Sequence, residues 1–594
     1  GLLSVAASGL LTTPSLQVQA GGLATGAAQR VQADTQLAMA PGTRLQLGGD
    51  QVLARLVDLG GPGDPGGAAV PAQVQLGSFT LAAGADGSDG VFSGRFSGDG
   101  SVAKQGAGTW LLRTDQAHGD TRIEAGTLQL GDGGTSGSLG RGAVVNDGLL
   151  RFQRSDAVQL TQAVSGSGSL QQAGSGNLSL ASTALSYTGD TIVSSGSLRT
   201  EGADRLPDAT HLRLAAGASL ATGGDDRLGA LTADGAVSLG GSVATSGHQR
   251  YAGPVTVTSS VPITLAAPAA RVEALHAGNQ WGPQPLSVDA GVLLLGAGRT
   301  GAAADAPWNP LSLGQVTLRG LADGATAAAG SQIDAGTLQI GAPVAAGVAA
   351  TGDARRDGQL HVLAGSLALR AHATPGYQVP VPAQGEVAAV DPLRGREIAL
   401  ADDTLWQNAH SQVRTEPGAS LLLQATAGGS IRLGQTANLL DGPVSALSGA
   451  AFNTAWAPID LLAGRQAGQA GITLAGQVVQ VGGSGVEADV LRFTTGRLVT
   501  EPTSPLTARL WYNDVNFGQQ RSLPGLQITL LPEALATVAS LGTADRPVQV
   551  NVGGLGTGGR TEGLNAGYVQ LLPKRAAGGG VAVFLAGPKV GQAG

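Results

Sequence analysis

Short runs of alternating apolar and polar residues are the dominant pattern along the chain. Each run takes about 4 to 6 residues and ends at Gly or at Asp-Gly. Period-2 alternation between turn residues is typical of β-strands with one buried face, and helical periodicity is scarce. The pattern predicts strands with Leu, Val and Ile inside and with Gln, Thr, Ser and Arg outside. Examples are Arg44–Leu47, Gln73–Leu76, Thr127–Leu130, Gln315–Leu318 and Gly471–Leu474.

One segment of this kind occurs twice. Gly98–Leu112 returns as Gly166–Leu180, and Gly119–Leu128 returns as Gly189–Leu198 after a short insertion between the two blocks. Repetition of short strands and glycine turns indicates a stacked solenoid. A coil of three short strands takes roughly 20 to 23 residues, so the distance between the copies predicts a separation of about three coils. The insertion fits a turn on the outside of the coil.

The composition favours a solenoid over a globule. The chain has 594 residues, of which 96 are Gly, 42% are apolar and 13% are charged. Glycine without a triplet period excludes collagen, and the steady supply of Leu, Val and Ile argues against disorder. A globule of this length would normally split into domains, whereas the core of a solenoid grows along one axis. We therefore predict an all-β parallel β-helix that forms an elongated rod.

Charge and cysteine content exclude several classes of protein. The formal net charge is −7 and no basic block is present, which argues against a nucleic-acid partner. The lack of Cys excludes disulfides and thiol-ligated metal sites. No run of about 20 apolar residues predicts a membrane-spanning helix. Because Gly1–Ser8 has neither a starting Met nor a charged n-region, we expect a processed product or a piece of a longer protein.

Both copies of the duplicated segment resemble the passenger-associated repeat of autotransporters. The two blocks of that repeat are G-x-G-x-L-x-K-x-G-x-G-x-L-x-L and Y-x-G-x-T-x-V-x-x-G-x-L, and Tyr187–Val193 fits the second block closely. The first copy has Ala117 and His118 where Tyr and its neighbour are expected. The second copy has Gln172 where the first has Lys104. This glycine spacing is more specific for an architecture than for an activity.

Further segments resemble the strand repeats of large filamentous haemagglutinin-like exoproteins. They are Leu228–Asp234, Ser242–Gly247 and Gln249–Val257. Residues Val490–Val552 are similar, less specifically, to the C-terminal parts of such exoproteins. Together the two resemblances imply a right-handed parallel β-helix that is exported by a Gram-negative bacterium and displayed on its surface or released from it. The expected location is therefore extracellular.

These patterns predict five regions along the chain. Residues 1–95 form N-terminal coils, residues 96–205 hold the duplicated repeats, and residues 206–370 form exoprotein-like coils. Residues 371–420 are rich in Pro and predict an excursion or a junction. Residues 421–594 form the C-terminal coils and the end region.

The strongest catalytic candidate is the pair Asp225–Asp226 followed by Gly247–His248. These residues resemble part of the site of parallel β-helix enzymes that hydrolyse polygalacturonan, in which carboxylates act as acid and base. Those enzymes also need a Gly after the His and a downstream Arg-x-Lys, whereas Gln249 follows here. A solvated turn accounts better for the Asp pair, and Asp402–Asp403 predicts another turn. No catalytic residue is therefore predicted.

The other candidates also favour structural interpretations. The seven histidines, which never form an i, i+2 or i, i+4 pair, are expected to be exposed turn residues: His118, His211, His248, His276, His361, His372 and His410. Asp86–Gly90 predicts an Asp-Gly turn rather than a calcium loop, and Gly60–Gly67 lacks the Lys-Ser/Thr of a phosphate loop. Trp511, Tyr512 and Phe517 are expected to pack at the C-terminal end rather than to bind sugar. No cofactor-binding or metal-binding residue is predicted.

The sequence thus predicts a non-enzymatic structural or adhesive surface protein. Its expected partners are further copies of itself, end to end or side by side, or a host or bacterial surface. Open ends of a β-helix are edge strands that invite pairing, so a fibre is one possibility. Two alternatives stay open: a polysaccharide hydrolase or lyase built on the β-helix, and a passive stalk of a giant exoprotein.

Overall fold

The computed structural model describes residues 1–60, 70–301, 306–321, 330–336, 338–341, 351–364 and 366–371, and beyond residue 371 the strands together with Ala419. Within these residues the chain consists of short strands, turns and one helix, α1 (Ala354–Asp357). Two compact units are distinguished, Gly1–Gly253 and Pro254–Gly594. The prediction of an all-β chain wound into stacked parallel coils is confirmed.

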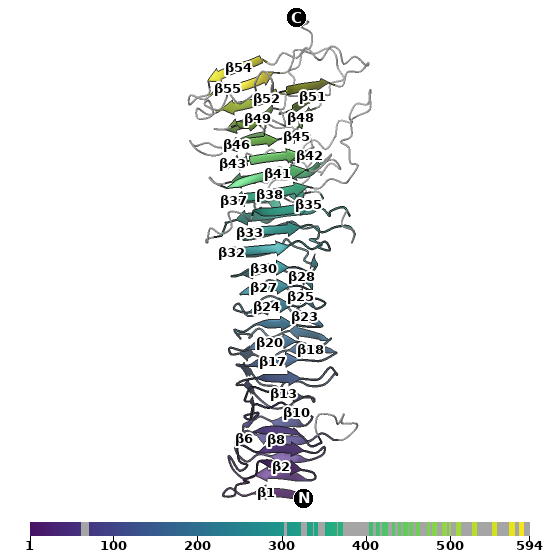
Figure 1. Ribbon diagram of the computed structural model, residues 1–594, viewed down its shortest axis with the longest axis vertical. Coiled ribbons are helices and arrows are strands. Elements are labelled where there is room, and N and C mark those ends of the chain that lie inside the picture. Colours follow the sequence, from purple (N-terminus) through teal and green to yellow (C-terminus); the bar gives the residue numbers. More distant parts are fainter. Residues whose placement is uncertain are drawn as a thin grey trace. The chain divides into compact units, whose positions relative to one another are not determined.

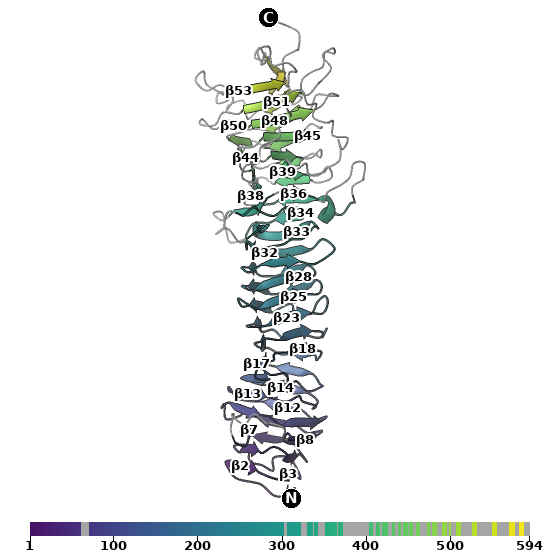
Figure 2. The same ribbon diagram turned by 90° about the vertical axis from the view of Figure 1, so that its right-hand side faces the viewer.

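In Gly1–Gly253 each strand pairs in parallel with a strand from the next coil. Figure 1 shows strands β13, β17, β20, β24, β27 and β30 one above another, and Figure 2 shows β23, β25 and β28 stacked in the same way. One coil runs from Ser219 to its partner Ala236, whereas a clearly longer one runs from Thr121 to its partner Val144. The coil length therefore varies more widely than the repeat indicated, because turns of different length join strands of similar length.

The strands of this unit form separate parallel sheets. The N-terminal sheets hold β1 (Leu2–Val5), β3 (Gly22–Thr25), β5 (Arg44–Gln46), β8 (Gln73–Gly77) and β11 (Arg95–Gly98), and β2 (Ser15–Val18), β4 (Gln36–Met39) and β7 (Arg55–Asp58). A further sheet, here called the first sheet, holds β6 (Gln51–Leu53), β9 (Leu81–Ala83), β12 (Val102–Lys104), β14 (Thr121–Ile123), β16 (Val144–Asn146) and β19 (Val164–Ser165).

Two further sheets complete the coils. The second sheet holds β10 (Gly90–Phe92), β13 (Thr109–Leu112), β15 (Thr127–Leu130), β17 (Leu149–Phe152), β20 (Ser169–Gln172), β22 (Thr191–Val193), β24 (His211–Leu214), β27 (Ala230–Ala233) and β30 (Gln249–Tyr251). The third sheet holds β18 (Ala157–Leu160), β21 (Asn177–Leu180), β23 (Ser197–Thr200), β25 (Ser219–Thr222) and β28 (Ala236–Leu239). Strands β26 (Asp226–Leu228) and β29 (Val243–Thr245) pair with each other.

The core consists of apolar side chains, mostly aliphatic, stacked from coil to coil. Trp110, Leu128, Leu150 and Leu170 occupy one row of the second sheet, and each is at most 3% exposed. Burial of one such side chain stabilises the fold by about 1.5–3 kcal/mol. The predicted alternation of buried and outward residues is confirmed in β17 and β20, whereas in β15 the polar Gln129 is buried as well.

The duplicated segment lies on different sheets in its two copies. In the first copy Val102 opens a strand of the first sheet, whose rows continue through Thr121 and Val144 to Val164. That path is three coils long, and the equivalent strand of the second copy, β20, then follows on the second sheet. The two copies are therefore three coils plus one sheet apart, rather than about three coils. The local sequence specifies the strands and turns but not the sheet in which they lie.

One glycine of the repeat is required by its backbone conformation in both copies. Gly126 and Gly196 occupy equivalent positions, and each has a φ of +66°. A Cβ there would lie 2.4 Å from the carbonyl oxygen of Gly108 and 2.3 Å from that of Gly176, respectively, in the preceding coil. Because both the conformation and the close approach exclude a side chain, these glycines set the spacing between coils.

Pro254–Gly594 contains longer strands than the first unit. Its first part holds β31 (Val255–Val257), β32 (Thr264–Ala274), β33 (Leu286–Gly296), β34 (Leu311–Leu318), β35 (Ser331–Ala335), β36 (Leu338–Ile340), α1, β37 (Gln359–Val362) and β38 (Ser366–Ala371). Strands β32 and β33 each span 11 residues and pair in parallel.

The later strands of this unit continue the parallel pairing up to β53. They are β39 (Asp403–Gln407), β40 (Gln412–Thr415), β41 (Ser420–Ala425), β42 (Ser430–Leu433), β43 (Asn438–Leu440), β44 (Val444–Ser448), β45 (Ala451–Ala455), β46 (Ile459–Ala463), β47 (Ile472–Ala475), β48 (Val478–Gly483), β49 (Val490–Thr495), β50 (Leu498–Thr500), β51 (Thr507–Tyr512), β52 (Gly525–Leu530), β53 (Gln549–Gly554), β54 (Gln570–Arg575) and β55 (Val581–Ala586). Strand β55 pairs antiparallel with β52 and β54.

The division after Gly253 coincides with none of the predicted region boundaries, which stay predictions. Two strands, β39 and β40, lie within the range 371–420 and pair in parallel with β36 and β37. The Pro-rich segment 372–382 itself lies outside the described residues.

Candidate functional site

The inward polar residues of the repeat satisfy backbone groups of the coil turns. Lys104 is 1% exposed, and its Nζ donates to the carbonyl oxygens of Gln105, Gly106 and Ala125 at 2.5, 2.7 and 3.3 Å. Burial lowers the pKa of Lys104, an effect that Asp89 and Asp86 partly oppose. Because its amine is fully used inside the coil, Lys104 is a structural residue.

Gln172 takes the place of Lys104 in the second copy. It is 3% exposed, and its Nε2 donates to the carbonyl oxygens of Gly174 and Gly176 at 2.9 and 3.0 Å. The departure from the repeat pattern at this position therefore exchanges one buried donor for another.

His118 and Tyr187 perform the same structural task from neighbouring positions of the two copies. The Tyr187 hydroxyl hydrogen-bonds to Thr191 Oγ1 at 2.6 Å, and His118 Nε2 hydrogen-bonds to the equivalent Thr121 Oγ1 at 2.9 Å. Both rings are buried, Tyr187 with 0% and His118 with 1% exposure. In the first copy Ala117 stands where the repeat has Tyr, and the neighbouring His118 makes the hydrogen bond instead. The prediction that His118 is an exposed turn residue is therefore wrong.

The environment of His118 keeps its ring neutral. Burial lowers the pKa of His118 to about 4, and Asp120 opposes this effect. The ring packs edge-on against Phe96 with the centroids 5.8 Å apart, and Nδ1 is buried without a hydrogen-bond partner. Protonation of that nitrogen would place an unpaired charge in the core, so His118 is unsuited to proton transfer with solvent.

A row of polar side chains joins four coils along the second sheet, from the buried Gln129 through the half-buried Arg151 and Gln171 to the exposed Ser194. Arg151 donates from Nε to Gln171 Oε1 at 2.8 Å and from Nη1 to Gln129 Oε1 at 3.3 Å. Gln171 Nε2 in turn donates to Ser194 Oγ at 2.7 Å. We call Gln129, Arg151, Gln171 and Ser194 the polar face. Its hydrogen bonds run along the coil stack and hold these side chains in fixed positions.

Further along the same sheet, two histidines converge on one hydroxyl group. His211 Nε2 and His248 Nε2 each lie 3.0 Å from Thr232 Oγ1, and the two imidazole centroids are 5.4 Å apart in an edge-on arrangement. His248 is exposed and His211 is partly exposed. Burial and the neighbouring Arg213 lower the pKa of His211. We call His211, Thr232 and His248 the histidine cluster.

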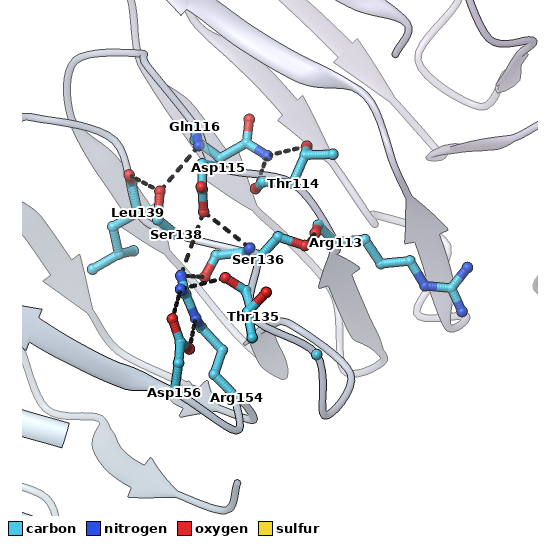
Figure 3. A network of polar contacts seen from close by, with 12 residues as sticks. Arg113, Thr114, Asp115, Gln116, Thr135, Ser136, Ser138, Leu139, Arg154 and Asp156 are labelled. Atoms are coloured by element: carbon cyan, nitrogen blue, oxygen red, sulfur yellow. Dashed lines mark hydrogen bonds and ion pairs between the residues drawn. The ribbon is translucent and has the colours of Figure 1, made fainter. Parts of the chain in front are cut away.

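The long turn that follows the first copy is held by one arginine. This turn, residues 131–143, joins β15 to β16, and Figure 3 shows Arg154 beneath it. The Arg154 guanidinium donates to the carbonyl oxygens of Thr135 and Gly137 at 2.5 and 3.1 Å. It also forms two hydrogen bonds with the Asp156 carboxylate, at 2.9 and 2.7 Å, which lower the pKa of Asp156. The turn is thus ordered by a paired charge.

The catalytic candidates Asp225, Asp226 and His248 have different hydrogen-bond partners. Asp226 is 1% exposed and accepts hydrogen bonds from Thr200 Oγ1 at 3.1 Å and from the Arg205 amide at 3.0 Å. Burial raises the pKa of Asp226. Asp225 accepts from the Ser242 amide at 2.6 Å, and His248 belongs to the histidine cluster.

The Asp pair therefore has two structural roles. The prediction of a solvated turn is wrong for Asp226, which opens β26 and holds the connection of residues 201–210 by its hydrogen bonds. The same prediction fits Asp225, which is exposed. The hydrogen bonds of the two carboxylates go to partners other than His248.

Residues 86–89 lie in the predicted turn between β9 and β10, and Gly90 already opens β10. Asp86 Oδ1 accepts from the Ser88 amide at 2.9 Å, and Asp86 Oδ2 pairs with Arg55 Nε at 3.1 Å. Asp89 Oδ1 accepts from the Thr109 amide at 2.7 Å in the next coil. Both carboxylates are thus used by protein donors.

The remaining candidates are only partly described. Residues 61–69, Asp402, Phe517, His372 and His410 lie outside the described residues, while Asp403, Trp511 and Tyr512 are described only as strand backbone. Across the described part of the chain, no group of three or more His, Cys, Asp or Glu side chains is placed to hold a metal ion. No helix among those residues is long and apolar enough to cross a membrane.

Sequence reasoning missed the histidine cluster because the coil length is uneven. His211 pairs with Ala230, and the register of β27 with β30 places His248 opposite Ala230 in the coil after that. Both coils are shorter than the expected one, and a coil of roughly 20 to 23 residues would have put His248 outside this row. The cluster could have been found only from the exact length of each coil, which decides which residues share a row. The sequence alone does not reveal that length.

Comparison with known proteins agrees with the repeat assignment. A model of the passenger-associated-transport-repeat matches residues 102–130 and 170–199, which overlap both copies. A 69-residue stretch, 11% of the chain, is 44% identical to a protein of Brucella suis biovar 1 (strain 1330) named "Adhesin BmaC autotransporter". The chain matches only 2% of that relative's length. No solved structure matches the chain, and the resemblance to filamentous haemagglutinin-like exoproteins stays a prediction.

Proposed function

We propose that this autotransporter passenger, which is displayed outside a Gram-negative bacterium, acts as an adhesin whose polar face contacts a cell surface. The relative named above is described as an adhesin, which supports a role of the same class. The proposal makes the coil a rigid carrier and assigns recognition to outward side chains.

The polar face is the single observation that carries this proposal. Its four side chains come from successive coils and are already ordered by mutual hydrogen bonds. Binding by an ordered surface loses little side-chain entropy, and Arg is a frequent anchor in interfaces. A surface of this kind suits repeated weak contacts with a polar polymer or a glycosylated protein.

The rival hydrolase interpretation has less support. Its strongest candidate, Asp226, is buried and used by Thr200 and Arg205, while His248 lies among different partners. A glycosidase needs two carboxylates that face one substrate bond. The described residues supply no observation that favours this rival.

The test uses beads coated with the purified chain and measures their binding to host epithelial cells and to bacteria. We expect the wild-type chain to bind above albumin-coated beads. The double variant Arg151→Ala, Gln171→Ala removes the centre of the polar face and should lower binding at least about fivefold. The matched control is Arg199→Ala, because Arg199 is an exposed arginine of β23 on the third sheet and should leave binding unchanged.

The same assay distinguishes the remaining partners and the stalk alternative. Clumping of beads with one another would show self-association of the chain. If the coated beads bind nothing while the bacteria that display the whole protein adhere, the adhesin proposal is wrong and the passive stalk is correct. Equal binding by the double variant and the wild type would remove the polar face from the proposal.

A further inference from the structure

The histidine cluster brings together two metal-binding side chains that lie two coils apart. Ala230 occupies the row position between His211 and His248. Because Ala230 ends in a methyl group, the two imidazoles can meet across it, with their centroids 5.4 Å apart. A larger residue at that position would separate them.

The Nε2 atoms of His211 and His248 both point toward the Thr232 hydroxyl group. Each Nε2 lies 3.0 Å from Thr232 Oγ1. One hydroxyl can donate to one ring and accept from the other, and the ring that donates from Nε2 takes the Nδ1-protonated tautomer when that nitrogen binds a metal ion. Zinc takes imidazole nitrogen at about 2.0–2.1 Å, and small side-chain rotations would bring both Nε2 atoms onto one ion.

The charges around the cluster are balanced. The Arg213 Nε lies 2.8 Å from Asp190 Oδ2, and the Arg250 Nη1 lies 2.8 Å from Asp234 Oδ1. Each guanidinium thus has its own carboxylate, and a cation that approaches the histidines does not meet an unpaired positive charge. The exposure of His248 leaves room for water ligands.

We propose that His211 and His248 together bind a divalent transition-metal ion, such as zinc, nickel or copper, through their Nε2 atoms. Imidazole nitrogen suits these ions, and water completes the coordination. Thr232 is a hydrogen-bonding neighbour and not a ligand. The bound ion joins the coil of β24 to the coil that contains β30.

Titration calorimetry of the full chain with zinc chloride and with nickel chloride tests this site. We expect one saturable site in the wild-type chain, with the affinity reduced about tenfold or more in His211→Asn and in His248→Asn. The matched control is His276→Asn, because His276 is an exposed histidine outside the cluster, and it should bind as the wild type does. Thr232→Val should retain binding.

A second measurement keeps the test independent of any loss of fold. Copper bound to the wild-type chain should give an electron paramagnetic resonance spectrum with two coordinated nitrogens, and each histidine variant should give one. The proposal is wrong if the wild-type chain shows no saturable site. It is also wrong if either cluster variant, with its circular dichroism unchanged, binds as tightly as the wild type.

Discussion

The two copies of the passenger repeat share their glycines but fill the coil differently. The first copy lies on the first and second sheets, and its core is aromatic, with Phe96 packed against both Trp110 and His118. The second copy lies on the second and third sheets, and Leu178 stands where the first copy has Trp110. The shared glycines, such as Gly126 and Gly196, thus define the coil, whereas the interior tolerates different side chains that satisfy the same backbone groups.

The largest effect is expected where the two copies are the same. Gly126→Ala should destabilise the coils around β15 by roughly 4 kcal/mol. The alanine would be strained at a positive φ, and its Cβ would clash with the carbonyl oxygen of Gly108. Amide hydrogen exchange of β13 and β15 measures the loss. The control is Gly134→Ala, where a Cβ would meet no atom closer than 3.8 Å and the cost should be small. Equal protection in the two variants would contradict the role assigned to Gly126.

The second effect is a pH dependence of stability that His118 gives to the first copy and that Tyr187 does not give to the second. Since burial lowers the pKa of His118 to about 4, the unfolded chain binds the proton first as the pH falls below about 6.5. Stability from this group is therefore lost between about pH 6.5 and 4 and amounts to roughly 3 kcal/mol. Urea unfolding across this range measures it.

The carboxylates also titrate in that range, so a variant must isolate the histidine. His118→Gln should unfold with a shallower pH dependence than the wild type, and Tyr187→Phe should leave that dependence unchanged. A wild-type slope that persists in His118→Gln would assign the effect to other groups.

A third effect tests whether the buried donors of the two copies are interchangeable. Lys104→Gln introduces the residue of the second copy and should cost less than about 1 kcal/mol. Lys104→Met leaves the carbonyl oxygens of Gln105, Gly106 and Ala125 without their donor and should cost about 1–3 kcal/mol. Urea unfolding of the three chains gives the order, and a Met variant as stable as the wild type would show that these bonds contribute little.

The smallest effect is expected on the outward side. Arg151→Ala removes two part-buried hydrogen bonds of the polar face, one of them to the buried Gln129, and its cost should stay near about 1 kcal/mol. A thermal melt that drops by no more than a few degrees would agree with this. A large drop would show that the polar face is part of the framework and would weaken its use as a recognition surface.

The sequence predicted the strands and the turns because both are local. Alternation along Thr127–Leu130 and the glycine at Gly126 specify a strand and a positive φ without any partner. The burial of Asp226 and the convergence of His211 with His248 could not be predicted in this way. Each depends on which residue of the next coil lies opposite, and a small change in the length of a turn moves that partner.

The sequence by itself determined that this chain winds into parallel coils and that it carries passenger repeats. Periodicity and glycine spacing are local properties, and parallel stacking is the arrangement that buries every alternate residue. Only the tertiary structure decided which sheet each repeat occupies and which outward side chains meet. The physical reason is that coils of unequal length, such as the short one from Ser219 to Ala236 and the long one from Thr121 to Val144, add up along the stack. The three coils from Val102 to Val164 together span fewer residues than separate the two repeats, which places the second repeat one sheet further round. The short coils between His211 and His248 bring the two histidines to one hydroxyl group.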